Sequence, residues 1–362
     1  MLKATSEYLK SRGLTGPTVV IDETRARANI RAMAAKARAS SVVFRPHFKT
    51  HQSPRVARWF ADEGVDRITV SSVRMAEQFA ETGWNDITIA FLLNPLEAPR
   101  ITDLAAHLRR KGGRLGVTVD SVVAARIAAE LDVAVWVKID TGYGRTGIRW
   151  DDAEHLSAVL DLIDQPAGLL SHTGHSYAAR GRTELEKIHR EAVQRMTAAG
   201  RGLPLSLGDT PCCSAVDAFD GIAEIRPGNF VFYDLMQLQI GSCDENQIAA
   251  AAVCPVVGIY PERNQVVVQG GAVHLSKESL NTVDRVIFGR LGHLVLPLAG
   301  QAAGLGGVLE NAPVVSLSQE HGIIDVPADL IGQVGIGDLL IVWPIHSCLM
   351  CDLHQEHTIC FL

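Results

Sequence analysis

The chain has 362 residues, of which 47% are hydrophobic, so it can bury a large core and is long enough for two domains. Its formal net charge of −6 supplies no sequence-wide basic field, which argues against nucleic acid as a partner. No apolar run reaches the roughly 18 residues of a membrane-spanning helix, and the first residues lack the apolar core of a signal peptide. The seven cysteines, an odd number without framework spacing, suit a reducing compartment. We therefore expect a cytoplasmic protein with no membrane partner.

Short β-branched runs alternate with stretches of helical periodicity through the first two thirds of the chain. Eight such runs are strand candidates, namely 42–49, 67–72, 87–92, 115–120, 133–140, 168–174, 204–209 and 222–228. Intervening stretches such as SVRMAEQFAETG (72–83) and RTELEKIHREAVQRMTAAGRG (182–202) repeat their apolar residues at three and four and end near glycine. Alternation of this kind predicts an α/β fold, a (β/α)8 barrel of the TIM type.

After about residue 245 the pattern becomes β-rich, with glycine turns. Examples are AAAVCPVVGIYPE (250–262) and DLLIVWPIH (338–346). We therefore expect an N-terminal segment over 1–16, a barrel over 17–244 and a C-terminal β-rich domain over 245–362. The early strand PTVVID (17–22) precedes the barrel and is a candidate to pair with it.

Polar residues stand at or near the C-terminal ends of the strand candidates. They are Lys49, Ser72, Asp120, Asp140, His172, Asp209 and Arg226. Barrel enzymes assemble their active sites at this face from several strands. The distribution therefore indicates an enzyme site rather than ordinary polar turns.

Lys49 lies in the segment RPHFKTH (45–51), with His47 and His51 two residues away on either side. All three would project from the same side of an ideal strand. Neighbouring cations, Arg45 included, and burial would both disfavour the protonated amine. A neutral lysine amine is a nucleophile that can form a Schiff base.

Five motifs in order extend the argument beyond single residues. RPHFKTH is followed by VKIDTGYGRTGI (137–148), SHTGHSY (171–177), SLGDTP (206–211) and EIRPGNFVFYD (224–234). Together they resemble the fold-type III pyridoxal-phosphate enzymes, the alanine-racemase-like barrels. Within that group they resemble the D-serine dehydratase and D-threonine aldolase family. The resemblance covers nearly the whole chain, from about Pro17 to the C-terminal PIHSC.

The resemblance implies that Lys49 carries pyridoxal 5'-phosphate as a Schiff base and that Arg145 faces its pyridine nitrogen. Because arginine only donates, it would leave that nitrogen unprotonated and the ring a weak electron sink. The phosphate would be held by backbone N–H groups of two turns after the last strands, with the Tyr177 hydroxyl added. The turn residues are Gly208, Asp209, Thr210, Gly228 and Asn229. The Asp209 carboxylate would repel phosphate, so we expect it to be turned away.

The segment WPIHSCLMCDLHQEH (343–357) carries a metal-like pattern. By the resemblance, His346 and Cys348 bind a divalent metal beside the cofactor, and residues i and i+2 of a strand share one face. Imidazole with thiolate favours zinc, with manganese or magnesium also open. This pairing resembles the dehydratase branch, whereas aldolases of the family place a carboxylate there. A closed structural zinc site of Cys348, Cys351, His354 and His357 is the alternative.

The resemblance thus predicts a metal-assisted lyase of 3-hydroxy-D-amino acids, with dehydration to a 2-oxo acid and ammonia as the first expectation. Retro-aldol cleavage to glycine and an aldehyde is the nearest alternative, with His47, His51, His172 and His175 as candidate bases or cofactor-positioning groups. An amino-acid racemase and a non-catalytic cofactor carrier are less favoured. We expect the protein to form a homodimer. We expect its small-molecule partner to be a D-amino acid substrate. The β-substituent of the substrate and the loaded metal stay open.

Overall fold

The computed structural model describes residues 1–297, 302–354 and 359–362. The chain divides into two compact units. The barrel unit comprises residues 30–230 and 240–242, and the β unit comprises residues 1–29, 231–239 and 243–362. Helix α2 (Glu23–Ala39) begins in the β unit and ends in the barrel unit.

Eight parallel strands form the barrel in the spatial order β2-β10-β9-β8-β6-β5-β4-β3. Their bounds are β2 Val43–Phe44, β3 Arg67–Val70, β4 Asp86–Leu92, β5 Arg114–Val119, β6 Ala134–Asp140, β8 Gly168–Ser171, β9 Leu205–Leu207 and β10 Glu224–Ile225. A bridge between His47 and Thr69 joins the two edges of this sheet, and the short β7 (Ile148–Arg149) pairs with β6. The predicted (β/α)8 barrel is confirmed.

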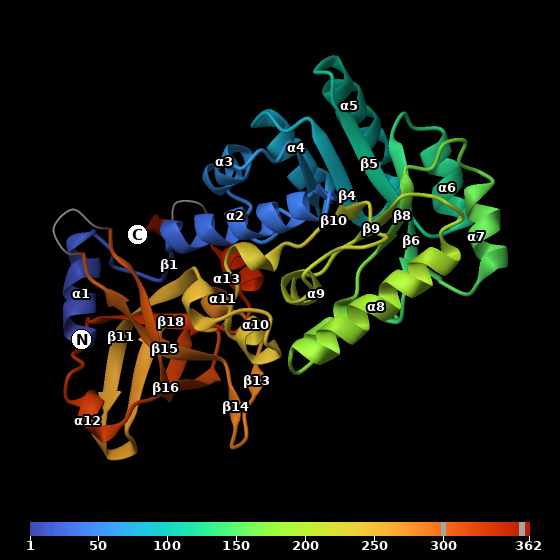
Figure 1. Cartoon of the computed structure of the whole chain (residues 1–362). Coiled ribbons are helices and arrows are strands. Elements are labelled where there is room, and N and C mark those ends of the chain that lie inside the picture. The colour runs from blue at the N-terminus through green and yellow to red at the C-terminus, as the bar shows by residue number, and fades with distance from the viewer. Residues whose placement is uncertain (298–301, 355–358) are drawn as a thin grey trace. The chain divides into compact units, whose positions relative to one another are not determined.

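Helices surround the barrel strands, as Figure 1 shows. They are α3 (Pro54–Asp62), α4 (Val73–Glu81), α5 (Ala98–Arg110), α6 (Val122–Ala129), α7 (Ala153–Leu160), α8 (Arg182–Ala199) and α9 (Thr210–Ala215). Because helices cover the outer face, strands such as β8 are buried at every residue. Ser72 and Ser121 accept backbone N–H groups at the starts of α4 and α6, so these strand-end residues are helix caps.

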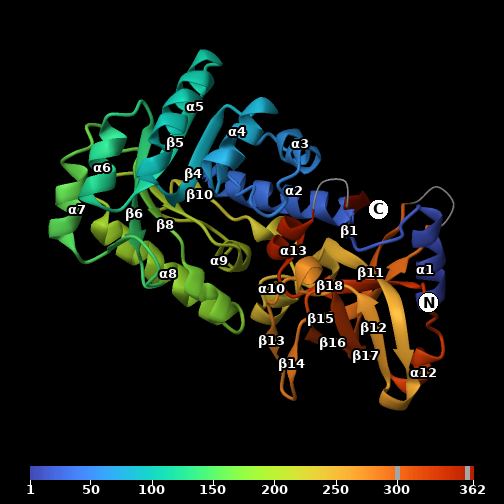
Figure 2. The same ribbon diagram turned by 180° about the vertical axis from the view of Figure 1, so that it is seen from behind.

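The β unit is a mainly antiparallel sheet in the order β12-β17-β16-β15-β18-β11-β1-β19, closed by pairing of β12 with β11. Its strands are β1 Thr18–Ile21, β11 Ala250–Tyr260, β12 Gln265–Gln269, β15 Gly289–Val295, β16 Gly304–Leu317, β17 His321–Asp325, β18 Leu339–Pro344 and β19 Ile359–Phe361, with a separate hairpin of β13 Leu280–Asn281 and β14 Val286–Ile287. Its helices are α1 (Leu2–Ser11), α10 (Leu235–Ile240), α11 (Ala272–Leu275), α12 (Ala328–Ile331) and α13 (Ser347–Leu353). Figure 2 shows α1 beside this sheet, where it contacts β18 and β15.

The early strand does not pair with the barrel, so that expectation was wrong. β1 runs antiparallel to β11, with Val19 opposite Ala252, and parallel to β19. All four of its residues are buried, because the β unit offers it an apolar partner on each edge. Residues 1–29 and 231–239 belong to the β unit. The barrel predicted from the sequence covers residues 17–244 instead.

Candidate active site

A cavity of about 420 Å³ is lined by residues at and beyond the C-terminal ends of the barrel strands. This volume lies in the range of small-molecule sites. Most of the predicted cofactor residues line it, namely Lys49, Arg145, Tyr177, Gly208, Asp209, Thr210 and Gly228. Asn229 directly follows the last of these and is buried. The structure therefore gathers the separate motifs of the barrel at one place.

Lys49 lines the cavity but is an exposed residue, so the expectation of a buried amine was wrong. Its backbone N–H donates to Nδ1 of His47 at 3.3 Å, which ties the lysine to the histidine that also lines the cavity. The amine is accessible to a ligand in the cavity.

Arg45 and His51 do not flank Lys49 as an ideal strand would place them. β2 ends at Phe44, and the chain then turns. The Arg45 guanidinium is buried and makes ion pairs with Glu224 at 2.6 Å and Asp86 at 2.5 Å. The His51 ring is buried and stacks on Phe60, with centroids 5.5 Å apart. Neither residue lines the cavity around Lys49.

The cavity is rich in positive charge. Lys138, Arg145 and Arg226 line it together with Lys49. Burial, and then the neighbouring Arg145 and Arg226, lower the pKa of Lys138 to about 8, and burial lowers the pKa of Arg226 to about 10. The guanidinium therefore stays charged near neutral pH, and Lys138 is largely charged.

The two histidines of the cavity add no charge. Burial lowers the pKa of His172 to about 3, although its Nδ1 lies 2.6 Å from the carbonyl oxygen of Gly208. Burial and nearby Lys49 hold the pKa of His47 well below its usual value. Fixed cations beside neutral imidazoles suit an anionic ligand such as a phosphate ester that also carries an aldehyde for a lysine amine.

The Asp209 carboxylate is held by three hydrogen bonds. It caps α9 by accepting the backbone N–H of Cys212 at 2.7 Å. It also accepts the hydroxyl protons of Thr173 and Ser176. These three donors hold the carboxylate in place beside the start of α9.

The glycines of the two turns have packing roles as well. The N–H of Gly208 donates to the carbonyl oxygen of Ser171 at 3.2 Å, so this amide is not a free phosphate donor. A Cβ on Gly228 would lie 2.9 Å from the carbonyl oxygen of His47. Glycine is therefore required where the turn after β10 meets the segment that carries Lys49.

The loop that carries Arg145 is held by two of the predicted strand-end residues. Asp140 accepts the backbone N–H groups of Gly142, Tyr143 and Gly144, and Asp120 accepts that of Gly147 at 2.9 Å. The Arg145 guanidinium lies over the Tyr143 ring, 4.9 Å from its centroid. Asp120 and Asp140 therefore shape the site without lining the cavity.

The predicted metal pair lies in the β unit, but on a helix rather than on a strand. β18 ends at Pro344, His346 is the N-cap of α13, and Cys348 is in its first turn. Their side chains are hydrogen-bonded, and Nδ1 of His346 lies 3.9 Å from Oδ2 of Asp234. The two side chains are therefore neighbours through helical rather than strand geometry, and Asp234 lies close to the histidine ring.

Nothing in the described part of the chain supports a closed four-ligand zinc site. No group of three or more histidine, cysteine or acidic side chains is arranged there to hold a metal. The ring Nε2 of His354 lies 3.2 Å from the carbonyl oxygen of His274. His357, the fourth ligand of that alternative, lies outside the described residues. His175 does not line the cavity.

Sequence reasoning missed Lys138 as a cavity residue and gave Arg226 no role. The sequence does carry a signal for Lys138, because it is a charged residue within the apolar run of β6. Arg226 stands immediately after β10 and was already counted among the strand-end polar residues. Its place in the cavity depends on neighbouring strands, which the sequence does not order.

Two family models together match most of the chain. Residues 21–235 match the family model of the alanine racemase N-terminal domain, and residues 249–360 match a serine dehydratase domain. The chain belongs to the alanine-racemase-like D-serine dehydratase and D-threonine aldolase family. Members of this fold family are expected to use pyridoxal phosphate.

Two relatives within this family match the chain over most of its length. The D-threo-3-hydroxyaspartate dehydratase of Delftia sp. strain HT23 is 32% identical over 359 residues, covering 92% of this chain and 91% of the relative. The D-serine dehydratase of Dictyostelium discoideum is 26% identical and covers 96% and 93%. The solved structure of the Delftia dehydratase superposes with a TM-score of 0.82 at 29% identity, covering 94% and 93%. A histidine and a cysteine two residues apart have each been replaced in solved variants of that dehydratase, the cysteine variant in a metal-free form.

No helix in residues 1–297, 302–354 or 359–362 combines the length and the apolarity that crossing a bilayer requires.

Proposed function

We propose that this chain is a pyridoxal-phosphate-dependent lyase that converts 3-hydroxy-D-amino acids to a 2-oxo acid and ammonia. The observation that carries the proposal is the match of 92% and 96% of the chain to two dehydratases of D-amino acids. The cationic cavity around Lys49 supports it independently, because it fits the cofactor of the family.

In this proposal Lys49 binds the aldehyde of the cofactor. The hydroxyls of Tyr177 and Thr210 and the backbone beside Gly228 hold its phosphate. Pyridoxal phosphate supplies an electron sink for the charge that develops at the substrate Cα. Once the substrate amine had displaced Lys49 from the cofactor aldehyde, the freed lysine amine would be the general base for the Cα proton, since Lys49 lines the cavity.

Two arginines are candidates for the pyridine nitrogen. Arg145 is the one that the resemblance implies, and it is exposed over Tyr143. What supports Arg226 is its burial and its anchoring, because its Nε donates to Ser206 at 2.7 Å and its terminal nitrogen donates to Ser171 at 2.5 Å. A fixed donor is better suited to hold a ring in one orientation.

The visible absorbance of the cofactor bound to variants of each arginine distinguishes the two candidates. Arg145→Glu would bring a carboxylate to a neighbouring ring nitrogen and favour its protonation, so turnover should show a longer-lived long-wavelength absorbance. Unchanged spectra with preserved cofactor affinity would show that Arg145 does not face the ring. Arg226→Lys should then change the spectrum instead.

His346 and Cys348 are the proposed ligands of a divalent metal, with zinc preferred for an imidazole and a thiolate. The solved variants of the Delftia dehydratase support this, because they concern a histidine and a cysteine with the same spacing. When bound, such an ion supplies Lewis acidity toward a substrate hydroxyl. In the elimination the Cα–H and Cβ–O bonds break, water leaves, and hydrolysis of the resulting enamine releases ammonia.

Retro-aldol cleavage is the second candidate, because relatives named D-threonine aldolase and 3-hydroxy-D-aspartate aldolase also match the chain. Of the candidate histidines, His47 and His172 line the cavity. Because burial holds the pKa of both imidazoles well below the usual value, they are weak proton acceptors and better suited to positioning the cofactor than to acting as the base.

One assay separates the two reactions. The holoenzyme is incubated with D-serine, D-threonine and D-threo-3-hydroxyaspartate, with and without a chelator. A 2-oxo acid with ammonia supports dehydration, whereas glycine with an aldehyde supports cleavage. Turnover of any of them excludes a non-catalytic carrier. The homodimer stays a prediction, which analytical sedimentation would test. The cytoplasmic location also stays a prediction, which cell fractionation would test.

A further inference from the structure

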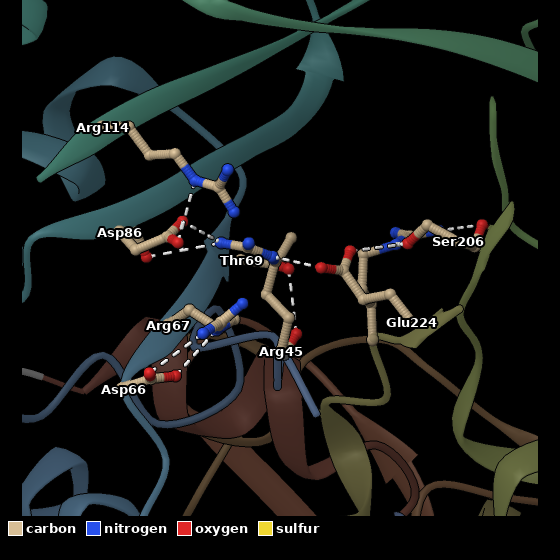
Figure 3. Close-up of polar contacts among 9 residues, drawn as sticks. Arg45, Asp66, Arg67, Thr69, Asp86, Arg114, Ser206 and Glu224 are labelled. Carbon is tan, nitrogen blue, oxygen red and sulfur yellow. Dashed lines mark hydrogen bonds and ion pairs between the residues drawn. The ribbon is translucent and has the colours of Figure 1, made fainter. Parts of the chain in front are cut away.

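A row of alternating charges crosses the interior of the barrel unit and ends at Arg226 in the cavity wall. Asp86, Arg114 and Glu224 are the first residues of β4, β5 and β10, so they lie at the N-terminal end of the barrel. Arg45 lies between Glu224 and Asp86, as Figure 3 shows. The row therefore connects the end of the barrel away from the cavity with the cavity itself.

Each contact in the row is short. Nε of Arg45 donates to Oε2 of Glu224 at 2.6 Å, and its terminal nitrogen donates to Oδ1 of Asp86 at 2.5 Å. Oδ2 of Asp86 also accepts Nε of Arg114 at 3.0 Å. Within this row, only Asp86 and Arg114 reach solvent, with side chains 21% and 58% exposed.

The hydroxyl of Ser206 links this row to the cavity and gives it a direction. It accepts Nε–H of Arg226 at 2.7 Å and lies 2.7 Å from Oε1 of Glu224. Because a carboxylate only accepts, the single hydroxyl proton is donated to Glu224. Hydrogen bonds joined in this way polarise one another.

The burial of these groups makes their charges interdependent. Arg226, Glu224 and Arg45 are 5%, 4% and 1% exposed. A buried charge that loses its partner is strongly unfavourable, so each group in the row depends on its neighbour. Burial lowers the pKa of Arg226, and Glu224 is the largest of the influences that raise it again.

We propose that Glu224 is a positioning residue for the bound cofactor. Through Ser206 it fixes the place and charge of the Arg226 guanidinium in the cavity, and Arg45 with Asp86 fixes Glu224. The charge presented to the cofactor is thereby set from the opposite end of the barrel. This role rests on the proposed binding of pyridoxal phosphate in the cavity.

The test measures the dissociation constant and visible absorbance of pyridoxal phosphate bound to the full-length protein. Glu224→Gln keeps the shape of the side chain and removes its charge. We expect it to weaken cofactor binding about tenfold, the effect of losing one charge-assisted contact, and to shift the absorbance maximum. Asp66→Asn is the matched control, because it breaks the ion pair of Arg67 at the same barrel end, where Asp66 is 71% exposed.

A double-mutant cycle with Arg226→Lys separates positioning from general destabilisation. If Glu224 acts through Arg226, the double variant should bind the cofactor more tightly than the product of the two single effects predicts. If the effects of the two substitutions on the dissociation constant simply multiply, the proposal is overturned. This holds even if Glu224→Gln has a lower melting temperature than the Asp66→Asn control.

Ser206→Ala tests the same link should Glu224→Gln not fold, because it leaves the ion pair of Arg45 with Glu224 intact. We expect the same weakening and the same absorbance shift. Wild-type binding and spectrum in this variant would overturn the role of Glu224. A wild-type protein that binds no pyridoxal phosphate would overturn the proposed function, and this role with it.

Discussion

Replacing Gly228 with alanine tests whether the turn after β10 sets the position of Lys49. The new Cβ would lie 2.9 Å from the carbonyl oxygen of His47 and 3.0 Å from its Cβ. The oxygen is backbone and cannot rotate away, so either the turn or the segment around His47 must move. Overpacking of this kind costs about 1–3 kcal/mol in the free energy of unfolding.

The movement should reach the cofactor site. The N–H of His47 donates to the carbonyl oxygen of Pro227 at 2.9 Å, so the two segments are coupled, and Lys49 follows two residues later. We expect the dissociation constant of pyridoxal phosphate to rise about tenfold, which corresponds to about 1.4 kcal/mol. Absorbance titration measures this, and urea denaturation measures the stability.

Gly221→Ala is the control for this variant. Its Cβ would meet only Val193, at 3.6 Å, but its φ of 77° strains an L-residue. We expect a loss of roughly 1 kcal/mol in the free energy of unfolding without a change in cofactor affinity. If Gly228→Ala loses a similar stability and still binds the cofactor as the wild type does, the coupling between turn and lysine is refuted.

Three further predictions follow from the described contacts. Lys49→Ala should abolish the visible absorbance of the bound cofactor, and borohydride reduction of the wild type followed by peptide mapping should label Lys49; label on Lys138 would contradict the assignment. Cys348→Ala or chelation should remove activity and leave the melting temperature within a few degrees of the wild type, whereas a large loss of stability shared with Cys351→Ala would indicate a structural ion. Because burial lowers the pKa of His51 to about 3, the unfolded chain binds a proton that the folded chain does not as the pH falls from about 6.5 toward 3. The free energy of unfolding should therefore decrease over that range, and acid denaturation of His51→Phe should show a flatter slope.

Charge in the cavity also bears on substrate choice. Lys138, Arg145 and Arg226 line it beside Lys49, and the Asp209 carboxylate is held by α9 and by Thr173 and Ser176. A substrate with a second carboxylate, such as D-threo-3-hydroxyaspartate, would bring a further negative charge close to these cations, whereas D-serine would not. A comparison of the two substrates at low and high salt would show whether the cations contribute to that choice.

The barrel could be predicted from the sequence because the patterns that indicate its strands and helices each lie within a short stretch of the chain. Each strand is a short apolar run buried on both faces, and each helix repeats its apolar residues at three and four. The cofactor motifs are likewise contiguous, so Lys49, Gly208 and Gly228 could be found as cavity residues without knowledge of the fold.

Only the tertiary structure decided where side chains point when a strand ends early. The i, i+2 rule failed for His51, because β2 stops at Phe44 and the chain turns after it. It also gave the wrong reason for His346 and Cys348, which meet at the start of a helix. A period of two holds only while the backbone remains extended.

The role of Arg226 depends on long-range pairing in the same way. Its partners Ser206 and Ser171 lie on β9 and β8, and the row behind it draws Arg45 from the segment after β2. These strands become neighbours only when the sheet closes. Periodicity along the chain determines which residues face the interior, but the order and closure of the strands determine which buried charges meet there.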